Sequence, residues 1–161
     1  MKTNFQIVGL PLKEFQPLFS LSDEKLAQKG ARRMTVDSKP GFPCRVSLED
    51  AEIGEKVILL PFRHHDVDLP YRALGPIFVR EDAKEAELSV GEVPEVVSTR
   101  TMSVRAYDKD SMMIDSAVVA GSEIKDHIEK LFTDPRIAYL HLHNAGAGCY
   151  SCKVERAKNV G

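Results

Sequence analysis

The stretch Arg100-Thr101-Met102-Ser103-Val104-Arg105-Ala106-Tyr107-Asp108 decides the fold class. Within it, Met102, Val104 and Ala106 alternate with more polar residues, which is the pattern of a strand with one buried face. A polar turn over residues 108–111 follows, and residues 112–119 return as a partner strand. The pattern predicts a β-hairpin, and therefore antiparallel pairing.

Other segments extend this pattern in both directions. Residues 137–144 and 149–156 flank a small loop and predict a second hairpin. Three shorter strands are expected over residues 5–10, 57–62 and 76–80. The run 57–62 is apolar on both alternating sets, so we expect a central strand covered on both faces.

Two short helices complete the expected fold. One covers residues 22–29, with Ser22 as its N-cap and Gly30 as its stop. In the other, Ser122 is the expected N-cap, and Asp134-Pro135 ends the helix because the residue before proline avoids the helical region. We therefore predict an α+β fold, a mainly antiparallel sheet built from hairpins with two short helices, in a single domain over residues 1–161.

Composition limits the kind of partner. The chain has 161 residues, of which 43% are hydrophobic and 29% charged, the balance of a globular protein. Its net charge is −2 and no block is strongly basic, so we expect no nucleic-acid partner. No apolar run is long enough to cross a bilayer, so no membrane partner is expected either.

The N-terminal residues and the cysteines predict the cellular compartment. Pro11, Lys13 and Glu14 interrupt what would be the apolar core of a signal peptide. The chain has three cysteines, an odd number that is unusual for a small secreted domain. Both observations predict a cytoplasmic protein.

His141 and His143 are the most suggestive pair of polar residues. Two apart on a strand, they share one face, an arrangement found in metal sites and anion pockets as well as in ordinary hydrogen-bonded strands. With a four-residue loop, His143 would face Tyr150 and His141 would face Cys152. A loop of another length would instead move the histidines to the face of Cys149.

The cysteines support weaker hypotheses. Cys149 and Cys152 are three apart on a predicted strand and so face opposite sides, which argues against a structural zinc site. We expect no cofactor and no metal, although a metal site formed by His141, His143 and one cysteine is kept as a lower-ranked alternative. Cys44 stands beside Arg45, whose charge would stabilise a thiolate.

A stiff loop supplies candidate anion ligands. Tyr71, Arg72 and Arg80 lie in a segment that also has two prolines and Gly75. Guanidinium groups are forked donors suited to carboxylate or phosphate. No phosphate loop, dinucleotide fingerprint or hydrolase nucleophile motif accompanies them.

Several of these segments also carry a family resemblance. They are Phe42-Pro43-Cys44-Arg45, Pro70-Tyr71-Arg72, Gly75-Pro76-Ile77-Phe78-Val79-Arg80, Arg105-Ala106-Tyr107-Asp108, His141 to Ala145, Gly148-Cys149 and Glu155-Arg156-Ala157. In them the chain resembles, over nearly its whole length, a bacterial family of uncharacterised proteins, the domain of unknown function family 1203. The resemblance implies no activity. It singles out Cys149 over Cys152, which stands where such proteins more often have a small apolar residue.

Three hypotheses of function follow. The first is a domain that binds a small anionic molecule through Arg45, Tyr71, Arg72, Arg80, His141, His143 and Cys149. The second is an enzyme in which Cys149 or Cys44 is the nucleophile and His141 or His143 its base. The third is a structural or interaction protein, for example a homodimer formed through an edge strand.

Overall fold

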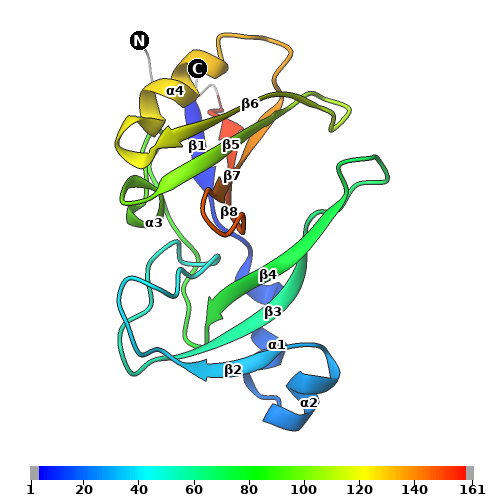
Figure 1. The fold of residues 1–161 in the computed structure, drawn as a ribbon, viewed down its shortest axis with the longest axis vertical. Helices are drawn as coiled ribbons and strands as arrows, with labels where there is room; N and C mark the ends of the chain where they lie inside the picture. Colours follow the sequence, from blue (N-terminus) through cyan, green and yellow to red (C-terminus); the bar gives the residue numbers. More distant parts are fainter. Residues whose placement is uncertain (1–3, 159–161) are drawn as a thin grey trace.

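The computed structural model describes residues 4–158 and contains two antiparallel sheets, one above the other in Figure 1. Residues 1–3, the start of the N-terminal stretch considered above, lie outside the described residues. The larger sheet consists, in spatial order, of β1 (Phe5–Val8), β8 (Tyr150–Arg156), β7 (Tyr139–Asn144), β5 (Thr101–Tyr107) and β6 (Met113–Ala120). Both predicted hairpins, β5–β6 and β7–β8, are present in it.

The smaller sheet consists of β2 (Arg32–Thr35), β3 (Lys56–His65) and β4 (Ala73–Arg80). β3 is the central strand, as its apolar run predicts, and Val57, Ile58 and Leu60 are buried. The prediction that both faces are covered is wrong at Leu59 and Pro61, which line a shallow cavity at the surface.

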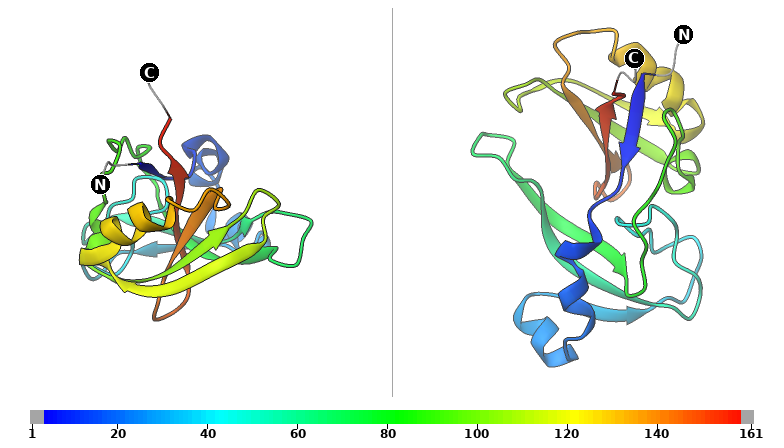
Figure 2. Two further views of the ribbon diagram at one scale, coloured as in Figure 1. Left: turned by 90° about the horizontal axis from the view of Figure 1, so that it is seen from above. Right: turned by 180° about the vertical axis from the view of Figure 1, so that it is seen from behind.

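Helices lie beside both sheets, with α4 at the top of Figure 1 next to the larger sheet and α2 at the bottom next to the smaller one (see also Figure 2). They are the 3₁₀ turns η1 (Leu12–Glu14) and η2 (Gly121–Glu123) and the α-helices α1 (Gln16–Phe19), α2 (Asp23–Gln28), α3 (Glu95–Ser98) and α4 (Ile124–Leu131). The Ser22 hydroxyl accepts a hydrogen bond from the amide of Lys25, which confirms the predicted cap of α2. Across residues 4–158, every helix is too short or too polar to traverse a lipid bilayer.

The start of α4 differs from the prediction. Ser122 lies inside η2, and α4 begins at Ile124 without a side-chain cap. Gly121 explains the difference, because a Cβ there would lie 2.0 Å from the carbonyl oxygen of Val97. The chain therefore turns tightly against the backbone before the helix, and Ser122 is used in that turn.

The main core lies between the larger sheet and α4. Met102, Val104 and Ala106 of β5 are buried there together with Ile124 and Ile128 of α4. This confirms the half-buried β5 and, with both hairpins, the α+β class. A second hydrophobic cluster fills the smaller sheet and its helices, and Tyr150 of the larger sheet joins it. One face of the larger sheet is thereby left to meet the smaller sheet.

Candidate functional site

The side chains of β7 divide the two faces of the larger sheet. Leu140 and Leu142 point into the core beneath α4. Tyr139, His141 and His143 alternate with them and therefore face the other way, as their spacing predicts. Both histidines are buried, and their neighbours are aromatic rings and further histidines.

Two of those neighbours come from the end of β3. His64 and His65 are consecutive, so on a regular strand they would point to opposite sides. The pairing of β3 with β4 is shifted by one residue between Phe62 and His65. This bulge re-aims the strand, and both rings reach β7: the His64 ring lies 5.1 Å from that of His143, and the His65 ring 5.0 Å from that of His141.

His64, His141 and His143 form a group that we call the trihistidine cluster. One ring nitrogen from each lies within 4.8 Å of the others. Three buried nitrogens in the cluster, Nδ1 of His64, Nδ1 of His141 and Nε2 of His143, have no hydrogen-bond partner. Buried polar atoms are rarely left unpaired, because each costs about 1–3 kcal/mol.

Hydrogen bonding fixes the proton of one ring in the cluster. Nδ1 of His143 lies 2.9 Å from the carbonyl oxygen of Gly148, which can only accept, so Nδ1 carries the proton. Nε2 of a neutral His143 therefore presents a lone pair. His65, outside the cluster, is saturated: its Nδ1 bonds to the Tyr71 carbonyl and its Nε2 to the Tyr139 hydroxyl.

All three rings of the cluster are neutral near pH 7. Burial and the nearby imidazoles lower the pKa of His141 to about 2. Burial and nearby Arg105 lower the pKa of His64 to about 4, and burial lowers that of His143 to about 4 against the opposing effect of the Gly148 carbonyl. Neutral imidazoles can accept hydrogen bonds or ligate metals.

The cysteine expected beside His141 is not there. His143 does pair with Tyr150 as predicted, but Leu142 then pairs with Cys152 and His141 with Lys153. A bulge at Ser151 adds one residue to β8, so the predicted pairing of His141 with Cys152 is wrong. Cys152 points into the core, where burial raises the pKa of its thiol to about 12.

Cys149 lines a different cavity, beside the β7–β8 turn. This cavity has a volume of about 440 Å³ and is lined by Arg45, Arg100 and Cys149 together with turn residues such as Gly146. Arg45 is 3% exposed, and its guanidinium donates to the carbonyls of Pro43 and Tyr150. Among residues 4–158 no carboxylate forms an ion pair with it.

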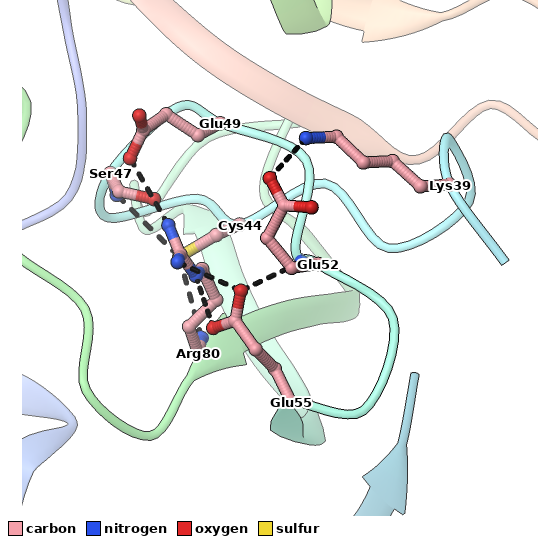
Figure 3. A network of polar contacts seen from close by, with 7 residues as sticks. All are labelled: Lys39, Cys44, Ser47, Glu49, Glu52, Glu55 and Arg80. Carbon is pink, nitrogen blue, oxygen red and sulfur yellow. Dashed lines mark hydrogen bonds and ion pairs between the residues drawn. The ribbon is translucent and has the colours of Figure 1, made fainter. Parts of the chain in front are cut away.

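Arg80 and Cys44 belong to a separate polar network, shown in Figure 3. The Arg80 guanidinium forms two bonds of 2.9 Å to Glu55 and one of 3.1 Å to Glu49. Cys44 is fully buried, and its sulfur accepts from the amides of Ser47 and Arg80. Both side chains thus have local partners, and neither lines the cavity or belongs to the group of histidines.

The structure therefore brings the predicted residues together in part. The rings of His141 and His143 lie near each other, and Arg45 lines the same cavity as Cys149. The Tyr71 ring lies 6.0 Å from the Tyr107 ring, measured between centroids. Arg72 is half-exposed beside Asp68, at 3.7 Å. His64 was not among the predicted site residues, although the sequence places it beside His65 at the start of the segment that leads to Tyr71 and Arg80.

Comparisons with known proteins give a family and nothing further. A family model described as "Protein of unknown function (DUF1203)" matches residues 41–156. This range contains the trihistidine cluster, the cavity of Arg45 and the network of Arg80. No curated protein and no solved structure matches the chain.

Proposed function

The chain belongs to the DUF1203 family of proteins of unknown function, and we propose that this member binds a small anionic molecule in the cavity beside the β7–β8 turn. Arg45 is the observation that carries the proposal. A guanidinium taken out of water is costly unless an anion or several acceptors face it. Arg45 is 3% exposed, and within residues 4–158 it bonds only to two neutral carbonyls.

The surroundings of Arg45 further support the proposal that an anion binds beside it. Burial lowers the pKa of Arg45, which means that its charge is poorly compensated. Arg100, on the same cavity, is already matched: it binds the buried carboxylate of Asp50 at 2.6 and 3.2 Å. The cavity therefore has one guanidinium that is paired and one that is free to take a carboxylate or phosphate oxygen.

A thermal-shift series with inorganic phosphate, sulfate and citrate tests this function. An anion at 100 times its Kd adds about 2.7 kcal/mol, which raises the Tm by roughly 5–10 °C in a chain of this size. Phosphate and sulfate also stabilise proteins without binding, through exclusion from the surface. The decisive comparison is therefore between variants.

Gly146→Phe is the informative variant. A Cβ at Gly146 has no neighbour within 4 Å, so a side chain can be added at the cavity wall without a clash. We expect Gly146→Phe to abolish the anion-dependent shift and Gly146→Ala to keep most of it. Val118→Phe, on the exposed face of β6, is the matched control and should respond like the wild type. Equal shifts in all four proteins would refute the proposal.

An enzyme with Cys149 as its nucleophile is the second candidate. Cys149 is the one partly exposed cysteine of the three, and it shares its cavity with Arg45. In native protein we expect iodoacetamide to modify Cys149 and to spare Cys44 and Cys152, as read by peptide mass spectrometry. An apparent pKa of Cys149 near the free value of about 8.5 in a pH series would remove this candidate.

A further inference from the structure

The trihistidine cluster lies outside the cavity of Arg45, and we propose that His64, His141 and His143 bind a divalent transition-metal ion of the Zn²⁺ type. One ring nitrogen of each lies within 4.8 Å of the other two, from strands of two different sheets. Zn²⁺–nitrogen bonds of about 2.0–2.1 Å would draw these atoms somewhat closer together.

The unpaired nitrogens are the first line of evidence. Nδ1 of His64, Nδ1 of His141 and Nε2 of His143 are buried and without a partner, although most buried polar atoms find one. One such atom is common in a protein. Three in one cluster, on rings that pack against other rings and have Arg105 as a charged neighbour, indicate that a single missing group satisfies them together.

The orientation of the rings is the second line of evidence. Metal-binding histidines generally donate their other N–H to a carboxylate or backbone carbonyl, which fixes the tautomer. His143 does this through Nδ1 and the Gly148 carbonyl, at 2.9 Å. His64 is held by its stack on Tyr150, with ring centroids 5.2 Å apart and planes 7° apart. The lone pair of His143 is thus pre-set, and the His64 ring is held beside it.

The donor set indicates the class of ion. Three neutral imidazoles favour Zn²⁺, Cu²⁺, Ni²⁺ or Fe²⁺ over Mg²⁺ and Ca²⁺, which prefer oxygen. In the described part of the chain no cysteine or carboxylate joins the three rings. A site with three protein ligands keeps a fourth position for water or for a small anion.

Loading with Co²⁺ tests the site, because tetrahedral Co²⁺ reports nitrogen ligation through its visible absorption. The full chain is treated with a chelator, dialysed and titrated with Co²⁺, then with Zn²⁺ in competition. We expect one equivalent of Co²⁺ to bind, with tetrahedral bands that Zn²⁺ abolishes. A wild-type chain that gains no such bands and retains less than stoichiometric metal would overturn the proposal.

Matched variants locate the ion. His64→Phe keeps the stack on Tyr150 and removes one ligand, and we expect it to weaken binding by more than the roughly 10- to 100-fold that loss of an outer partner costs. His127→Gln, on α4 at the opposite face of the larger sheet, should bind like the wild type. Equal affinity of the two variants would overturn the assignment.

A measurement on the wild type covers the case in which His64→Phe does not fold. Nitrogen NMR of the imidazoles should show three rings shifting when Zn²⁺ is added, with His65 and His127 unchanged. Shifts confined to other histidines would contradict the site. Because Gly146→Phe changes none of the three ligands, failure of anion binding and failure of metal binding are separate results.

Discussion

The network of Arg80 and the trihistidine cluster are both polar groups set among strands, yet they are built in opposite ways. Arg80 faces two carboxylates, and its guanidinium makes three charge-assisted bonds (Figure 3). The three histidines leave three buried nitrogens without a partner. The first arrangement already pairs its charged groups with one another, so it stabilises the fold. The second has a deficit that a ligand can fill, so it is the better candidate for function.

The largest effect in this comparison is expected from Arg80→Met. The side chain is 21% exposed, and its loss would leave Glu55 half-buried without a counter-charge. We expect the free energy of unfolding to fall by about 2–3 kcal/mol, measured by urea denaturation. Arg72→Met is the matched control, because the exposed pair with Asp68 should be worth less than about 0.5 kcal/mol. Equal losses of stability in the two variants would contradict the view that the Arg80 pair stabilises the fold more than the Arg72 pair.

The stability difference between wild type and Arg80→Met should depend on pH through Glu55. Hydrogen bonds from Arg80 lower the pKa of Glu55 from its ordinary value of 4.5. The folded state therefore favours the charged carboxylate, and its contribution is present in full above pH 4.5 and is lost as the pH falls further. We expect the gap between wild type and Arg80→Met to stay constant from pH 7 to about pH 5 and then to narrow. A gap that widens in acid would contradict the role of Glu55.

A smaller effect is expected within the cluster itself. His141→Leu removes a buried ring whose Nδ1 has no partner, so the chelator-treated variant should lie within about 1 kcal/mol of the wild type. Excess Zn²⁺ should then stabilise the wild type and leave His141→Leu unchanged, as followed by thermal unfolding. If metal-free His141→Leu lost as much stability as Arg80→Met, the His141 ring would be needed for the fold.

Much of the fold could be predicted from local pattern. The alternation of Met102, Val104 and Ala106 gives both the strand and its buried face, and a polar turn gives the hairpin. β2 was missed because Arg32-Arg33-Met34-Thr35 is partly exposed and shows no such alternation. The cap at Ser122 failed for a reason that lies elsewhere in the chain, namely the close approach of Gly121 to the backbone of Val97.

The candidate sites were harder to predict because bulges decide them. One extra residue in β3 turns His64 toward β7, and one in β8 turns Cys152 away. A register read from the sequence assumes a regular ladder, and a shift of one residue exchanges the two faces. Arg80 was misjudged for a related reason. Its residue type suits an anion, but its partners, Glu49 and Glu55, are distant in sequence and visible only once β4 is folded.

His64 stands on one sheet, and His141 and His143 stand on the other, about 80 residues further along the chain. An ion held by all three would act as a cross-link that closes a long loop, and closing such a loop removes conformational entropy from the unfolded chain. The amides of β3 and β7 should therefore exchange with deuterium more slowly when Zn²⁺ is bound. The relative motion of the two halves of the molecule would then depend on the supply of a trace element.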